Sequence, residues 1–221
     1  MIFDASVWGM ILTGIKETLL MVALSSAISY LIGIPLGILL VVSDKNGIKP
    51  MPKLNSVVGF IINILRSIPF MILLIMVLPI TRAIVGTTLG WKAVVPPLVF
   101  AAAPYIARMV ESSLKETDAG VIEAAKSMGA GNMQIVTKVY LPEAKPSLLT
   151  GAAISITTIL GYSAMAGFVG GGGLGTIAIN YGYYRYQTDI MVLTVIILVI
   201  IVQLIREAGT RLSRNTDKRI R

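Results

Sequence analysis

The first long stretch without a charge runs over positions 18–43, between Glu17 and Asp44. These 26 residues would extend about 39 Å as an α-helix, which is more than the ~30 Å hydrocarbon thickness of a bilayer. The rest of the chain agrees, since 55% of its 221 residues are hydrophobic, 14% are charged and the mean hydropathy is +0.82. The sequence therefore predicts an all-α membrane protein and argues against a soluble globule and against disorder.

Further apolar stretches predict further spans. Residues 54–81 are interrupted by Arg66 and are interpreted as one long helix. Residues 91–108 form a short span whose flanking cations reach the two interfaces. Residues 188–206 form another span, whose apolar residues are mostly Val, Ile and Leu. Arg66 is either a functional charge within the membrane or the end of a shorter buried helix, where a long side chain reaches the interface.

The stretch between Lys145 and Arg185 contains 39 uncharged residues, about 58 Å of helix, which is too long for one crossing. It holds either one span over 146–169 followed by an outer loop or re-entrant turn, or two short spans. Cations concentrate on the cytoplasmic side, and five spans with the amino terminus outside place fourteen cations inside and four outside. We therefore predict five spans, at 18–43, 54–81, 91–108, 146–169 and 188–206. We also predict a cytoplasmic segment at 108–145 and a basic cytoplasmic tail at 207–221.

The residue content excludes several kinds of chemistry. Without Cys or His, the chain can form no disulfide, no Cys/His zinc site and no Cys or His catalytic group. None of the eleven carboxylates lies within an expected span, so the chain lacks the acid with which proton-coupled carriers hold a proton in the bilayer. No stretch matches the phosphate-binding G-x-x-x-x-G-K-[ST] pattern. We therefore expect no catalytic residue, metal or cofactor in this chain, and we expect a transporter of this kind to take its energy from another subunit.

A net charge of +8 generally indicates either nucleic-acid binding or the cytoplasmic loops of a membrane protein. In so apolar a chain the second reading applies, and we expect no nucleic acid as a partner.

The cytoplasmic segment contains a spaced motif. Glu123-Ala124-Ala125 is followed after three residues by Gly129, and after nine more by Val139-Tyr140-Leu141-Pro142. Small side chains let a partner approach a helix closely, Gly129 with Gly131 can end that helix in a left-handed turn, and Pro142 marks the start of the next element. The pattern predicts a short helix that fits a groove on a partner; the alternative is a solvated amphipathic helix with no partner.

This motif resembles the EAA signature of ATP-binding-cassette importer permeases, which reads EAA, three residues, G, nine residues and I-x-L-P. The one departure is Val139 in place of Ile, a conservative change. The resemblance implies a type I ABC importer permease fold over residues 10–206, a bacterial inner-membrane location, and a helix seated in a cleft of a separate ATPase subunit that binds ATP and magnesium. By the same resemblance, the ATPase-coupling residues are Glu123, Ala124, Ala125, Gly129, Leu141 and Pro142.

Other segments resemble the methionine-uptake permeases in particular: RSIPF at 66–70, GYSAM at 161–165, GGGGLG at 170–175 and YGY at 181–183. The resemblance implies methionine import by two copies of this chain, two ABC ATPase subunits and an extracytoplasmic substrate-binding lipoprotein. Glycine-betaine permeases are the nearest alternative, because spans without a fixed acid suit any net-neutral solute. A membrane scaffold that binds a cytoplasmic partner without transport is the alternative from another class.

Two groups of residues are candidates for the translocation pathway. Tyr162, Ser163 and Met165 lie well inside the fourth span, where they either line a pathway or belong to ordinary helix packing. A run of four glycines forms either a flexible outer turn or a gate or hinge near the site where the binding protein docks; these are Gly170, Gly171, Gly172 and Gly173.

Overall fold

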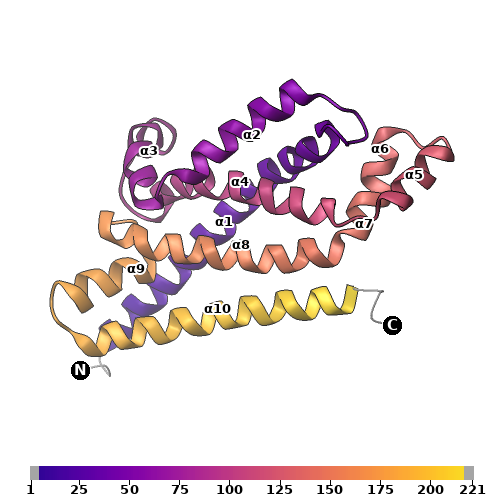
Figure 1. The fold of residues 1–221 in the computed structure, drawn as a ribbon. Coiled ribbons are helices and arrows are strands. Elements are labelled where there is room, and N and C mark those ends of the chain that lie inside the picture. The colour runs from indigo at the N-terminus through magenta and orange to yellow at the C-terminus, as the bar shows by residue number, and fades with distance from the viewer. Residues whose placement is uncertain (1–4, 217–221) are drawn as a thin grey trace. The chain divides into compact units, whose positions relative to one another are not determined.

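The computed structural model describes residues 5–216 (Figure 1); residues 1–4 and 217–221, which include the end of the expected tail, lie outside the described residues. Every regular element in the described range is helical. Four segments are long and apolar enough to cross a membrane, and the bent pair of α2 (Pro52–Ser67) and α3 (Phe70–Val85) makes a fifth if the pair counts as one span. The long helices are α1 (Ala5–Ser43), α4 (Trp91–Lys115), α8 (Lys145–Met165) and α10 (Thr188–Thr216). A 3₁₀ turn, η2 (Ala166–Val169), extends α8.

The second apolar stretch consists of two helices, because α2 (Pro52–Ser67) ends before Ile68-Pro69 and α3 (Phe70–Val85) begins directly after them. A proline disfavours helical dihedrals at the residue before it and has no N–H to continue the helix. Pro69 itself is extended, with φ −56° and ψ 135°. The prediction of one long helix over 54–81 is therefore wrong; the break is visible between the two labels in Figure 1.

Helices α1 and α4 are longer than the charge-free runs that predicted them. Helix α1 begins at Ala5 and so includes Glu17, and α4 continues to Lys115 and so includes Glu111. Charges mark where a helix can leave hydrocarbon, but the helix continues for as long as its backbone and side chains find partners. The expectation that no carboxylate lies in a spanning helix therefore holds for the apolar runs and not for the full helices.

Contacts divide the chain into two compact units. Unit 1 consists of the described parts of Met1–Ile28, Ile68–Ala102 and Ile156–Arg206, and unit 2 of the described parts of Ser29–Ser67, Ala103–Ser155 and Glu207–Arg221. Each long helix contributes residues to both units. A buried cluster of Ile11, Ile177 and Ile190 lies in unit 1, and one of Leu40, Ile62 and Ala107 lies in unit 2.

Within unit 2, glycines allow α1 to approach α4 closely. A Cβ atom at Gly33 would lie 2.6 Å from Cγ2 of Ile106, and one at Gly37 would lie 2.6 Å from Cβ of Val110. Neither space can hold a methyl group, so these positions require glycine at the present helix separation. Small residues at helix contacts are typical of membrane proteins, where close backbone packing replaces the hydrophobic effect.

The cytoplasmic segment predicted at 108–145 contains the end of α4 and a series of short helices, all in unit 2. They are α5 (Ala119–Ser127), α6 (Asn132–Ile135), the π-helical turn η1 (Val136–Tyr140) and α7 (Leu141–Glu143). In unit 1, α9 (Gly173–Ile177) and the π-helical turn η3 (Ala178–Tyr183) fill the chain between α8 and α10. They are too short to cross a bilayer, as the five-span prediction requires.

Candidate functional site

Helix α5 presents the first part of the spaced motif at the surface. Asp118 caps the helix by accepting a hydrogen bond of 2.7 Å from the backbone N–H of Gly120. Ala125 is only 5% exposed and attaches the helix to unit 2, whereas Glu123 and Ala124 are exposed. The helix is therefore held by one face, and its other face is open to a partner.

A left-handed turn at Gly129 ends this helix, as the sequence predicted. Gly129 has φ +79°, its N–H donates to the carbonyl of Lys126 at 2.9 Å, and the N–H of Ala130 donates to the carbonyl of Ala125 at 3.0 Å. This pair of bonds is the Schellman arrangement, which favours glycine at the left-handed position. Gly131, in contrast, has φ −73° and directly precedes α6 as its N-cap, so the prediction that it shares the left-handed turn is wrong.

Large apolar side chains surround this turn without cover. Met128 is 81% exposed, Met133 74% and Val121 44%. We call six of the exposed residues of this region the α5–α6 surface; they are Val121, Glu123, Ala124, Met128, Gly129 and Met133. Exposed apolar side chains gathered around a small-residue helix are typical of a surface that binds another protein, and the flexible thioethers of methionine adapt to a partner.

The second part of the motif points mostly inward. Tyr140 is buried in η1, Leu141 is half-buried, and Pro142 is exposed in the first turn of α7, where a proline costs no helical hydrogen bond. Burial, and to a smaller degree the negative charge of Asp44, raises the pKa of the Tyr140 phenol above its usual value. The motif therefore combines an exposed helix at its start with an anchor at its end.

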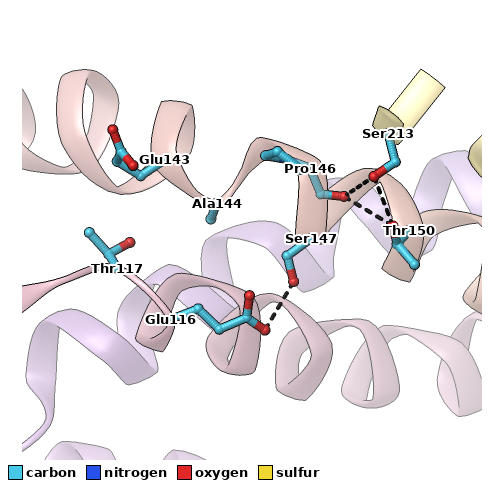
Figure 2. A pocket seen from close by; sticks show the side chains of 8 residues that line it. All are labelled: Glu116, Thr117, Glu143, Ala144, Pro146, Ser147, Thr150 and Ser213. Atoms are coloured by element: carbon cyan, nitrogen blue, oxygen red, sulfur yellow. Dashed lines mark hydrogen bonds between the residues drawn. The ribbon is translucent and has the colours of Figure 1, made fainter. Parts of the chain in front are cut away.

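A cavity of about 320 Å³ lies where α4, α7, α8 and α10 meet in unit 2 (Figure 2). The hydroxyl of Ser213 donates to the carbonyl of Pro146 at 2.9 Å, and that of Ser147 donates to a carboxylate oxygen of Glu116 at 3.1 Å. These bonds connect the end of α10 and the end of α4 to the start of α8. The lining residues are Glu116, Thr117, Glu143, Ala144, Pro146, Ser147, Thr150 and Ser213.

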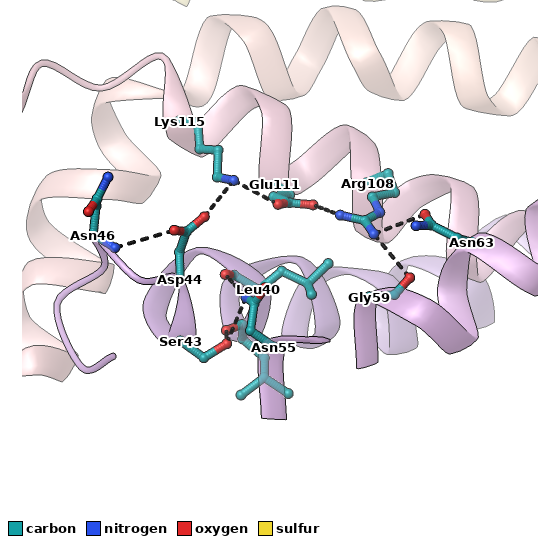
Figure 3. A network of polar contacts seen from close by, with 11 residues as sticks. Leu40, Ser43, Asp44, Asn46, Asn55, Gly59, Asn63, Arg108, Glu111 and Lys115 are labelled. Carbon is teal, nitrogen blue, oxygen red and sulfur yellow. Dashed lines mark hydrogen bonds and ion pairs between the residues drawn. The ribbon is translucent and has the colours of Figure 1, made fainter. Parts of the chain in front are cut away.

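A second polar cluster joins α4 to α2 and to the end of α1 (Figure 3). Lys115 forms ion pairs of 2.8 Å with Asp44 and 2.9 Å with Glu111, and Glu111 forms one of 2.7 Å with Arg108. The hydrogen bond from Lys115 holds the pKa of the Asp44 carboxyl below its usual range. Sequence reasoning missed this cluster: the spacing of 108, 111 and 115 on one helix face was its only signal, and the partners on α1 and α2 gave none.

The three pathway candidates occupy different environments in unit 1. Tyr162 stacks on Phe70, with ring centroids 4.5 Å apart and planes 8° from parallel. Met165 is 46% exposed, whereas Ser163 is buried and its hydroxyl donates to the carbonyl of Leu160 at 2.7 Å. Tyr162 and Met165 therefore remain candidates for a pathway surface, and the Ser163 hydroxyl serves its own helix.

The glycine run is a packed turn of unit 1 rather than a loose loop. Gly170, Gly172 and Gly173 have φ between +69° and +74°, and a Cβ at Gly171 would lie 2.5 Å from Cγ2 of Val94. The N–H of Gly90 also donates to the carbonyl of Gly170 at 2.9 Å. Conformation and close packing both require these glycines, and whether the run acts as an outer turn or as a gate or hinge stays a prediction.

Residues 33–221 match the family described as binding-protein-dependent transport system inner membrane component. The probable D-methionine transport system permease protein MetI of Vibrio cholerae is 46% identical over 95% of this chain and 93% of the relative. The methionine import system permease protein MetP of Bacillus subtilis is 42% identical over 82% of each chain. A solved structure of the MetNI methionine ABC transporter, described as inward facing, has a TM-score of 0.96 and 46% identity, covering 98% of this chain and all of the other. This chain therefore belongs to the family of binding-protein-dependent transport system inner membrane components.

Proposed function

We propose that this chain is the membrane-spanning permease subunit of an ATP-driven importer of methionine. The observation that carries the proposal is likeness over nearly the full length to permeases named for methionine transport, together with the TM-score of 0.96 to the methionine transporter. A separate ATPase subunit hydrolyses ATP with magnesium, and an extracytoplasmic lipoprotein delivers the solute. Two copies of this chain and two ATPase subunits form the complex.

The α5–α6 surface is the place where the ATPase acts. Its apolar side chains are exposed, and Glu123 and Gly129 are exposed beside them in the chain. Leu141 and Pro142 follow Tyr140, whose buried ring anchors the segment to unit 2. Closure of two ATPase subunits displaces this surface as a rigid lever, and the displacement switches the pathway between its two open states.

The charge distribution supports a membrane orientation with the segments at 45–53 and 108–145 on the cytoplasmic side. The cations of the two expected inner segments, from Lys45 to Lys53 and from Arg108 to Lys145, all belong to unit 2. The four expected outer cations, Lys16, Arg82, Lys92 and Arg185, all belong to unit 1. By the positive-inside rule, the amino terminus lies outside and the carboxy terminus inside.

The substrate is tested by uptake of labelled methionine and labelled glycine betaine in cells with and without this chain, with its ATPase and binding protein present. We expect methionine uptake to require the chain and betaine uptake to be independent of it. Betaine uptake that depends on the chain, with methionine uptake unchanged, would refute the substrate and leave the importer class intact. Co-purification adds a second readout: an importer brings down an ATPase subunit, whereas a scaffold binds its partner without any uptake.

A further inference from the structure

An ion-pair chain in unit 2 connects segments that are distant in sequence. Its central residue is Lys115, at the end of α4, whose Nζ lies 2.8 Å from Oδ2 of Asp44 and 2.9 Å from Oε1 of Glu111. Asp44 directly follows α1, so this lysine ties the end of α1 to α4. Figure 3 shows the ammonium group between the two carboxylates.

The chain continues from Glu111 to α2. The other carboxylate oxygen of Glu111 accepts a hydrogen bond of 2.7 Å from Nη1 of Arg108. Nη2 of the same guanidinium donates to Oδ1 of Asn63 at 2.9 Å and to the carbonyl of Gly59 at 3.1 Å. Both acceptors lie on α2. The end of α1, α4 and α2 are therefore joined by four charged groups of alternating sign and zero net charge, which are Asp44, Lys115, Glu111 and Arg108.

Burial makes these links costly to break. The Glu111 side chain is only 11% exposed, whereas the Asp44 side chain is 26% exposed and that of Lys115 is 47% exposed, so the cost of breaking the chain is largest at Glu111. A carboxylate at such a position that loses its cation keeps its desolvation penalty and loses the attraction that offset it. Moving α2 or the end of α1 away from α4 therefore carries an electrostatic penalty, and the three elements are expected to move together.

One end of the ion-pair chain borders the segment that carries the spaced motif. Asp44 and Lys115 line a cavity of about 390 Å³, and Ile122 of α5 and Tyr140 of η1 line the same cavity. The charge of Asp44 is near enough to Tyr140 to contribute to the raised pKa of its phenol. Ile122 and Tyr140 therefore border the same space as Asp44 and Lys115, so this end of the ion-pair chain lies beside the segment that carries the motif.

We propose that Lys115 is a positioning residue that transmits displacement of the α5–α6 surface to α2 by holding the end of α1, α4 and α2 as one body. The inference rests on the proposed function, since it concerns how ATP hydrolysis by a partner is coupled to transport. It assigns a role to residues outside the spaced motif. Removing Lys115 alone also costs stability, since it leaves Asp44 without its cation, so the role in coordinated movement is read from transport coupling and not from folding.

The test uses the whole complex of this chain, its ATPase subunit and its binding protein in liposomes, with methionine uptake and ATP hydrolysis measured together. Lys115→Met keeps the apolar stem and removes the charge. We expect the methionine carried per ATP hydrolysed to fall severalfold, because hydrolysis then proceeds without the linked movement of α2. Lys115→Arg can still pair with both carboxylates and should keep the unaltered ratio.

A matched control comes from α10, where the exposed side chains of Arg211 and Glu207 pair with each other within the same helix. Glu207→Gln should leave the ratio unchanged. An unchanged ratio in Lys115→Met would overturn the proposal, and so would a Lys115→Arg variant as defective as Lys115→Met. If Lys115→Met does not assemble, Asp44→Asn removes only the ion pair between Asp44 and Lys115. A lowered ratio in Asp44→Asn together with the unaltered ratio in Asp44→Glu supports the proposal. A normal ratio in Asp44→Asn overturns it.

Failure of the proposed function would be seen in the unaltered complex, as absence of methionine uptake. In that event, stimulation of ATP hydrolysis by the binding protein replaces uptake as the readout. Loss of this stimulation in Lys115→Met with retention in Lys115→Arg supports the positioning role, and equal stimulation in both overturns it.

Discussion

Single polar side chains of α1 complete the hydrogen bonding of α9 in unit 1. Glu17 accepts a bond of 2.7 Å from the N–H of Gly173, and the Thr18 hydroxyl accepts one of 2.9 Å from the N–H of Leu174. The first N–H groups of a helix have no partner within it, and a carboxylate complements the positive end of the helix. Glu17, which in the sequence marks the boundary of a charge-free run, is thus a hydrogen-bond acceptor for the glycine turn.

Thr18→Val removes the acceptor while keeping the side-chain shape, and leaves the buried N–H of Leu174 without a partner. We expect a loss of about 1–3 kcal/mol of stability, measured as a lower midpoint of thermal unfolding in detergent. Thr13→Val is the control, because the exposed Thr13 hydroxyl bonds only to the carbonyl of Gly9 in its own helix. Equal midpoints for the two variants would contradict this account of Thr18.

The carboxyl of Asp44 makes stability depend on acidity. Its pKa is lower in the folded protein than in the unfolded chain because Lys115 donates to its charged form. A depressed folded pKa contributes stability that is complete above the ordinary Asp value of about 3.9 and is lost as the pH falls through the lower folded value. We expect the thermal midpoint of the unaltered protein to fall below about pH 4, and Asp44→Asn to show a weaker fall; an identical pH profile in both would refute this.

At the scale of elements, two substitutions at Gly129, in the turn after α5, distinguish an effect on folding from an effect on binding a partner. Gly129→Ala has open space around it, since no atom lies within 4 Å of the added Cβ, and it costs about 1 kcal/mol through the positive φ alone. Gly129→Asp relieves part of that strain, because aspartate tolerates the left-handed region, but adds bulk and charge at the α5–α6 surface. We expect Gly129→Asp to fold and to lose the ATPase subunit or its response to binding protein.

The neighbouring glycine supplies the control for this prediction. Gly131 is exposed, has φ −73° and has its nearest neighbour, Oε1 of Gln134, 3.9 Å from an added Cβ. Gly131→Ala should therefore assemble and transport normally. Co-purification with the ATPase subunit and uptake of methionine are the measurements, and normal uptake by Gly129→Asp would remove the coupling role of this turn.

For the whole molecule, the unequal distribution of cations between the expected inner and outer segments predicts the membrane orientation. Reporter fusions at Lys49, between α1 and α2, and at Gly131, before α6, should register as cytoplasmic. A fusion at Leu89, in the connection between α3 and α4, should register on the outer side. An outer signal at Gly131 would overturn both the orientation and the proposed contact with an ATPase, since ATP is hydrolysed inside the cell.

The sequence by itself determined the helical class, the five apolar segments and the turn at Gly129. These features depend on local properties: a run without charges long enough for a bilayer, and a residue that takes a positive φ without strain. The spacing of the motif was equally readable, because it lies within a few helical turns. The break at Pro69 was readable in principle, and only the assumption of one long helix concealed it.

The tertiary structure alone decided what the polar residues do. Glu17 meets a turn 156 residues further along the chain, and Lys115 meets Asp44 as well as its own helix neighbour. Whether Tyr162 is stacked and Ser163 is buried likewise depends on which elements pack against α8. A charged or hydroxyl side chain can be satisfied by many partners of similar energy, so its partner is chosen by the packing of distant helices and leaves no local pattern in the sequence.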